Sequence, residues 1–182
     1  MKKILAPSLA ALALALTGCG NAGDTDDRST HGAGDASLDA VIAQIGEVST
    51  ANRLLKNADL QDPFQGAGAY TIFLPDNAAF AKLPKEELEL LESKAGRPEI
   101  IDFLTRHIAE GAISRDDLDV ALDVNGGTIE LTSVTDEPIE IRRVDGKVVV
   151  GSGKDAPALT GISKAASNGV VYVIDGFIPP KN

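Results

Sequence analysis

The chain of 182 residues contains few groups that could do chemistry. Its one cysteine is Cys19, and its two histidines are His31 and His107. These three residues do not stand at the spacings typical of zinc ligands. Adjacent carboxylates such as Asp116 and Asp117 point in different directions on a helix, so they do not form a catalytic pair. We therefore predict no metal site, no cofactor and no enzymatic activity, with a hydrolytic enzyme as the remote alternative.

Cys19 closes a segment that has the three-part layout of an export signal. Two lysines precede an apolar run over residues 4–16, and small residues follow it. The run is too short for a transmembrane helix, which needs about 20 consecutive apolar residues. The motif Leu16-Thr17-Gly18-Cys19 resembles the bacterial lipobox, which implies cleavage before Cys19 and attachment of a diacylglycerol to its thiol. We predict a lipoprotein signal peptide over residues 1–18 and lipidation of Cys19; the alternative is a cysteine near an ordinary cleavage site.

Residues 19–36 follow as a predicted flexible tether. They are rich in Asp and Gly, and no large apolar side chain is present to offset the entropy of ordering. Gly20 after the cysteine resembles the signal for transfer to the outer membrane. We therefore expect export and a lipid anchor in the cell envelope, at the outer membrane if the host has one. The whole chain has 17 basic and 27 acidic side chains, and this excess of negative charge argues against a nucleic-acid partner.

Apolar spacing predicts helices over most of the first half of the folded part. Leu38, Val41, Ile42 and Ile45 share one helical face, and either Asp35 or Ser37 can cap its start. A strand is predicted over residues 70–74, because they are β-formers that end at a proline. Four further helices are predicted, namely one around residues 54–58, one capped by Asp76, one beginning at Pro84, and one beginning at Pro98 that contains Ile100, Ile101, Leu104 and Ile108.

Beyond Gly111 the apolar residues alternate with polar ones, which predicts strands. Alternation marks residues 129–131 and 139–141, and Asp145-Gly146 before residues 148–150 is typical of a two-residue hairpin turn. Asn168-Gly169 repeats this turn signal before the apolar run 170–174, which is expected to be buried on both faces. Helices followed by antiparallel strands predict an α+β fold, in which the earlier strand pairs with the later sheet.

Two segments match the signatures of a known family. Residues 71–83, TIFLPDNAAFAKL, and residues 167–175, SNGVVYVID, are similar to the first and second signatures of fasciclin domains. Ile178-Pro179 follows the second, and the stretch from Leu104 to Leu118 lies between them with His107 and Gly111. The chain thus resembles a single fasciclin domain over about residues 36–180. The resemblance implies a wedge of about seven strands flanked by helices, an adhesion or matrix module, and no catalytic activity.

The middle motif departs from the family pattern. Many animal members pair Tyr with His there and use the pair in receptor binding, whereas this chain has Arg106-His107. Receptor binding is therefore not carried over to this pair. His107 lies near an apolar helical stripe, so we interpret it as a core imidazole bonded to the backbone, with a binding role as the weaker candidate. Most signature residues, including Asn77 and Asn168, suit cores, turns and caps, so the signatures mark a fold more than a ligand site.

The sequence as a whole predicts three parts and a function in binding. The parts are a signal peptide at residues 1–18, a lipidated cysteine and acidic tether at 19–36, and a fasciclin-like domain at 37–180. The expected partners are a membrane, through the lipid on Cys19, and an unidentified protein or extracellular matrix component. A homophilic or structural envelope role with weak self-association is the alternative.

Overall fold

The computed structural model describes residues 34–61, 64 and 68–180, so the predicted signal peptide, Cys19, His31 and most of the predicted tether lie outside the described residues. The fold is α+β with seven strands in the described part, as predicted. The helices are α1 (Leu38–Ala43), α2 (Ser49–Asn57), α3 (Asn77–Phe80), α4 (Lys85–Glu92), α5 (Arg97–Thr105) and α6 (Arg115–Val124), with a 3-10 turn at Gly46–Val48. The strands are β1 (Tyr70–Pro75), β2 (Ile108–Glu110), β3 (Thr128–Leu131), β4 (Ile139–Val144), β5 (Lys147–Val150), β6 (Leu159–Ala166) and β7 (Gly169–Ile174).

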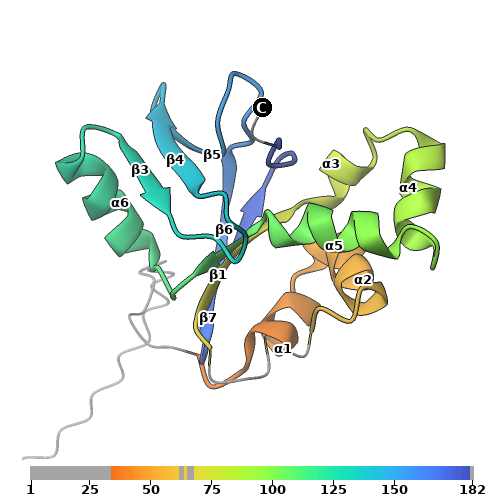
Figure 1. Cartoon of the computed structure of the whole chain (residues 1–182). Helices are drawn as coiled ribbons and strands as arrows, with labels where there is room; N and C mark the ends of the chain where they lie inside the picture. Colours follow the sequence, from red (N-terminus) through yellow and green to blue (C-terminus); the bar gives the residue numbers. More distant parts are fainter. Residues whose placement is uncertain (1–33, 62–63, 65–67, 181–182) are drawn as a thin grey trace, which may run out of the picture.

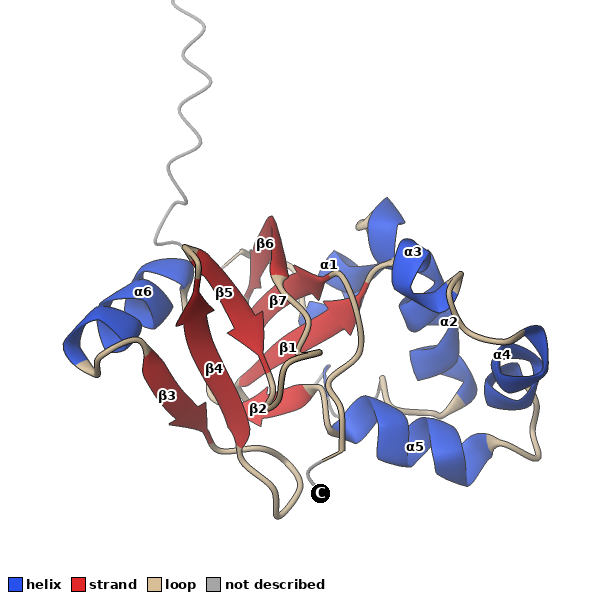
Figure 2. Cartoon of the chain, turned by 90° about the horizontal axis from the view of Figure 1, so that it is seen from above, coloured by secondary structure: helices blue, strands red, loops and turns tan. Residues whose placement is uncertain are grey.

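The strands form two sheets that make a wedge, with five of the described helices on one side and one helix on the other. One sheet has the order β2-β1-β7-β6 and the other the order β3-β4-β5. Helices α1 to α5 lie on one side of the strands and α6 lies on the opposite side (Figures 1 and 2). The early strand β1 does pair with the later sheet, as predicted, and it runs parallel to β7 from Tyr70 opposite Gly169 to Pro75 opposite Ile174.

Strands β1 and β7 are buried on both faces, because a separate hydrophobic core lies on each side of them. Ile72 and Leu74 of β1 and Val171 of β7 face a core shared with α1 to α5. Phe73 and Tyr172 face a second core shared with α6 and the three-stranded sheet. Alternate residues of a strand point to opposite faces, so a strand between two cores is continuously apolar. The prediction for residues 170–174 is confirmed, since all of them are buried.

Two predictions for the middle of the chain are wrong. Helix α5 ends at Thr105 and Ile108 begins β2, because the carbonyl of His107 accepts a hydrogen bond from Phe73 N (2.9 Å) and the chain turns into the sheet. Residues 115–124 form helix α6, where no helix was predicted. Only Leu118 and Leu122 of α6 are buried, so its apolar pattern is too sparse to recognise in sequence.

The two predicted hairpin turns have different outcomes. Asp145-Gly146 is confirmed, because Val144 pairs with Lys147 and both turn residues have positive φ angles of 49° and 78°. The second turn lies one residue earlier than predicted, since Ala166 already pairs with Gly169. Gly169 is instead needed for close approach of two strands. A Cβ at this position would lie 2.1 Å from the carbonyl oxygen of Tyr70 on β1.

Helix capping is partly local and partly tertiary. Asp76 caps α3 as predicted, since its side chain accepts from Ala79 N at 2.6 Å. The side chain of Ser37 does not cap α1; Leu38 N at its start instead donates to Asn168 Oδ1 at 2.9 Å, across 130 residues of sequence. In the described part of the chain, no helix is long and apolar enough to cross a membrane.

Candidate functional site

His107 lies fully buried at the corner between α5 and β2, where it joins three parts of the chain. Its Nδ1 lies 2.8 Å from the carbonyl oxygen of Phe103 on α5, and Ile178 N donates to its Nε2 at 3.1 Å. An amide can only donate, so Nε2 accepts and the proton of the neutral ring is on Nδ1. Both nitrogens are therefore bonded to the backbone. This confirms the interpretation of His107 as a core imidazole, although it follows α5 and does not belong to it.

The surroundings of His107 keep its ring neutral. Burial lowers the pKa of His107 from 6.5 to about 4; the hydrogen bond to Phe103 acts in the opposite direction, and the positive charge of Arg106 lowers it further. A neutral imidazole without a free nitrogen cannot act as a general acid or base on a bound molecule. The His107 corner is accordingly structural.

Aromatic rings fix the C-terminal segment after β7 to this corner. Phe177 packs edge-on against Phe80 of α3 and Phe103 of α5, each with ring centroids 5.2 Å apart. The ring of Phe103 also contacts His107, with centroids 5.0 Å apart. The segment is thus held by aromatic packing on one side and by the Ile178–His107 hydrogen bond on the other. Ile178 and Pro179 lie next to a hollow as a result.

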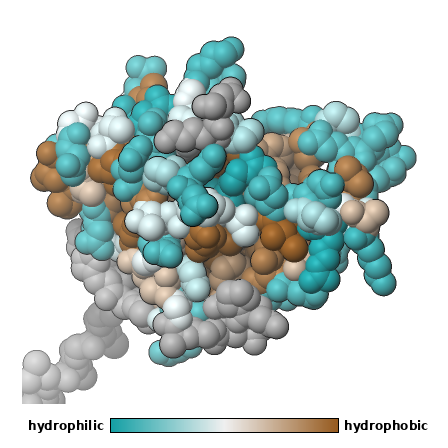
Figure 3. Space-filling model, in the orientation of Figure 1, coloured by the Kyte–Doolittle hydropathy of each residue, from teal (hydrophilic) through white to brown (hydrophobic). Residues whose placement is uncertain are grey.

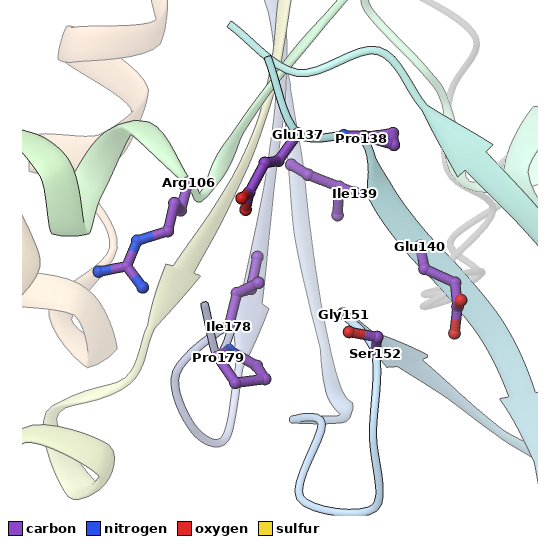
Figure 4. A pocket seen from close by; sticks show the side chains of 9 residues that line it. All are labelled: Arg106, Glu137, Pro138, Ile139, Glu140, Gly151, Ser152, Ile178 and Pro179. Carbon is purple, nitrogen blue, oxygen red and sulfur yellow. The ribbon is translucent and has the colours of Figure 1, made fainter. Parts of the chain in front are cut away.

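This hollow is a groove on the surface beside His107, formed where four segments of the chain meet (Figure 4). It is a shallow hollow, because the space of about 400 Å³ along it includes open solvent; it is a surface groove and not an enclosed cavity. Arg106 lines one end, and the C-terminal segment lines the middle. The groove residues are Arg106, Glu137, Pro138, Ile139, Glu140, Gly151, Ser152, Ile178 and Pro179. We refer to it as the Arg106 groove.

Two charged side chains of the Arg106 groove have partners within the chain. Arg106 donates through Nε to the carbonyl oxygen of Asp102 and through Nη2 to its carboxylate, both at 3.1 Å. Glu140 Oε1 lies 2.5 Å from Arg142 Nε. Arg142 also donates through Nη2 to the carbonyl oxygen of Gly153 at 2.7 Å. Glu137 differs from these residues, because its carboxylate has no such partner in the part of the chain that the structure describes.

The adjacent carboxylates that the sequence offered as candidates for catalysis lie away from this groove, at the starts of helices. Asp116 and Asp117 are in the first turn of α6, where Asp117 N donates to Ser114 Oγ at 3.2 Å in an N-terminal cap. A second pair of adjacent carboxylates, Glu86 and Glu87, is exposed in the first turn of α4. Among residues 34–61, 64 and 68–180, no three His, Cys, Asp or Glu side chains are placed to hold a metal ion. The structure brings none of these carboxylates together with His107.

The asparagines of the two signatures hold helix ends. Asn77 Oδ1 accepts from Thr50 N at 3.0 Å near the start of α2, and its Nδ2 donates to the carbonyl oxygen of Gly46 at 2.9 Å. Asn168 accepts from Leu38 N and donates through Nδ2 to the carbonyl oxygen of Phe64 at 2.5 Å. The prediction that the signatures mark a fold is confirmed at these positions.

Several groove residues were missed in the sequence. Glu137, Pro138 and Ser152 come from loops around β4 and β5, while Arg106 follows α5 in the middle of the domain and Pro179 follows β7 near its end. No periodicity or motif connects these segments, because the groove exists only where tertiary packing places them side by side. Arg106 had been noted as a departure from a family pattern, the Ile178-Pro179 pair as part of a signature, and residues 139–140 as part of a predicted strand, but none as part of a groove.

The fold and the groove together define a small α+β wedge domain with a surface hollow beside a closed histidine corner. The fasciclin domain family matches residues 46–180. The chain belongs to this family.

Relatives and a solved structure are consistent with this assignment. Protein sll1483 of Synechocystis sp. is 34% identical over 132 residues, which cover 72% of this chain and 67% of that protein. The transforming growth factor-beta-induced protein ig-h3 of Sus scrofa is 30% identical over 147 residues, 76% of this chain but only 19% of that protein. A solved FAS1 domain pair from the insect cell adhesion molecule fasciclin I superposes with a TM-score of 0.70 and 17% identity, over 81% of this chain and 52% of that one. The last comparison supports the fold alone.

Proposed function

We propose that this protein is an exported lipoprotein that displays its fasciclin domain at the cell envelope as a non-enzymatic interaction or adhesion module. The observation that carries the domain's part is the closed His107 corner, where both ring nitrogens bond to the backbone beside an open groove. The groove offers surface for binding but no acid, base or nucleophile from this histidine. Membership of the fasciclin domain family supports the proposal, and the family's fold is also found in an insect cell adhesion molecule.

The anchor half of the proposal rests on the sequence before residue 20. A cysteine after the apolar run at residues 4–16, in a chain with no other cysteine, is the natural site for a lipid. More than one acyl chain gives stable anchoring, because each buried methylene contributes about 0.8 kcal/mol. We expect Cys19→Ser to lose acyl labelling and to leave the membrane fraction. Continued labelling of the variant would contradict the anchor.

The binding half can be tested on the chain from residue 20 onward, which keeps every described residue and contains no cysteine. A cysteine introduced by Ser152→Cys places a photo-crosslinker in the Arg106 groove. The matched control, Glu86→Cys, places the same reagent on the exposed start of α4. We expect a specific envelope protein or matrix component to be crosslinked from position 152 and not from position 86. No specific product from either position over several growth conditions would contradict an interaction module.

An exposed apolar pair on α6 is the feature on which a second, homophilic candidate would rest. Val120 and Val124 are 61% and 75% exposed on the solvent face of the helix, where hydrophobic side chains are visible at the left of Figure 3. Two valines make a small patch, and the net charge of −10 makes two copies repel each other. We therefore expect a monomer in sedimentation at high protein concentration, and a dimer that Val124→Lys disrupts would favour the homophilic candidate.

A further inference from the structure

We propose that the Arg106 groove binds a lysine-like side chain of a partner, with its alkyl stem on the apolar floor and its ammonium group at Glu137. This inference rests on the proposed function, because it names the chemistry of the partner in the same groove.

The floor of the groove is apolar and already ordered. Ile139 and Ile178 are only 3% and 7% exposed, and Pro138 and Pro179 flank them. The hydrogen bond from Ile178 N to His107 holds this part of the floor in place. Such a surface suits the methylene stem of a long side chain, which packs along apolar atoms while its charged end stays in water.

The wall charges leave one negative group uncompensated. Arg106 is bonded to Asp102, and Glu140 lies against Arg142. Glu137 has no cation within ion-pair distance in the part of the chain that the structure describes. The backbone of Glu137 is positioned by Thr135, whose Oγ1 accepts from Glu137 N at 3.3 Å. In Figure 4 its side chain lies between Arg106 and Ile139 and above Ile178, beside the apolar floor.

Ligands of other charge fit this arrangement less well. An anionic side chain would approach Glu137 and would compete with Asp102 for Arg106. A purely apolar side chain would cover the floor but would withdraw water from the Glu137 carboxylate without replacing its interactions. The net charge of −10 also attracts basic partners to the domain as a whole. A single positive charge on an aliphatic stem can pair with the Glu137 carboxylate while the stem covers the apolar floor.

The probe is a blocked Gly-Lys-Gly peptide, titrated into the isotope-labelled chain from residue 20 onward and followed by backbone amide shifts. We expect shifts at Glu140, Ser152 and Ile178 and a dissociation constant weaker than about 1 mM, as for one exposed ion pair with a small apolar contact. The same peptide with norleucine in place of lysine keeps the stem and removes the charge. Gly-Glu-Gly reverses the charge.

Two variants separate the groove from the rest of the acidic surface. Glu137→Gln keeps the shape and should weaken binding of Gly-Lys-Gly about fivefold, while Glu86→Gln on α4 should leave it unchanged. Equal binding to both variants, equal binding of the norleucine peptide, or shifts mapped away from the groove would overturn the inference. If position 152 captures a partner whose binding ignores Glu137→Gln, the proposed function stands and this inference fails. If the lysine peptide binds in the groove but no partner is captured, the groove binds lysine as inferred and the proposed function fails.

Discussion

Acidification should destabilise the domain through His107. In the folded chain the pKa of this buried ring lies near 4, while an unfolded histidine has the ordinary value of 6.5. Between these values the unfolded chain binds a proton that the folded chain does not. Stability must therefore fall as the pH falls from above 6.5 toward 4. Well above pH 6.5 the ring is neutral in both states and contributes no pH dependence.

The size of the effect follows from the difference between the two pKa values. Each pKa unit corresponds to about 1.4 kcal/mol, so the full loss is about 3 kcal/mol once the pH is below 4. About 2 kcal/mol of it is lost between pH 7 and pH 5. A loss of this size is a large part of the stability of a typical domain, which is roughly 5–15 kcal/mol.

The assay is urea unfolding of the chain from residue 20 onward at several pH values between 7 and 4.5. His107→Gln serves as reference, because its amide can still donate and accept but does not titrate. Carboxylates that titrate in acid affect both proteins alike, so the difference in unfolding free energy isolates the imidazole. His31→Gln removes the only other histidine and should keep the pH dependence of the parent chain.

The reasoning is refuted if the parent chain and His107→Gln lose the same stability between pH 7 and pH 5. If His107→Gln is too unstable to purify, the ring can be titrated directly in the parent chain by NMR. The Nδ1-protonated form should persist below pH 5. A midpoint near 6.5 would show that the ring is accessible and would contradict the closed corner.

Three other substitutions test what holds the fold together. Gly169→Ala should lower the melting temperature strongly or prevent folding, because its Cβ meets the Tyr70 carbonyl oxygen at 2.1 Å; Gly46→Ala, where a Cβ meets nothing within 4 Å, is the matched control. Asn168→Ala should cost about 1–3 kcal/mol in denaturant unfolding and expose the first amides of α1 to hydrogen exchange. Tyr172→Phe should cost about 1 kcal/mol, since the hydroxyl donates to a backbone carbonyl at 3.0 Å. Unchanged unfolding curves for these variants would contradict the respective contact.

Much of the fold could be predicted from local sequence, because its causes are local. The strand at residues 70–74, the cap at Asp76 and the turn at Asp145-Gly146 each depend on neighbouring residues. The continuous apolar run at residues 170–174 predicted a strand buried on both faces, since polar residues are missing from both of them. Burial of His107 was also predicted correctly from its spacing to Leu104 and Ile100, although helix α5 ends at Thr105, before His107.

Other features depend on residues that only the folded chain brings together. Asn168 replaces Ser37 as the cap of α1, because a side-chain amide 130 residues away is better placed than the adjacent hydroxyl. The end of α5 is set by the sheet, which takes the carbonyl of His107 into a hydrogen bond with β1. Helix α6 has a weak apolar pattern and is fixed to β4 by Arg143, whose Nη2 lies 2.9 Å from Asp119.

The sequence by itself determined the family, the α+β order, and the single cysteine that makes a lipid anchor a specific hypothesis. Those conclusions follow from spacing and composition, which one sequence displays directly. The Arg106 groove was decided by tertiary structure, because its floor and walls come from the α5–β2 corner, the loops around β4 and β5, and the C-terminal segment. Which charges remain uncompensated there depends on distances between side chains, and the order of residues along the chain does not contain those distances.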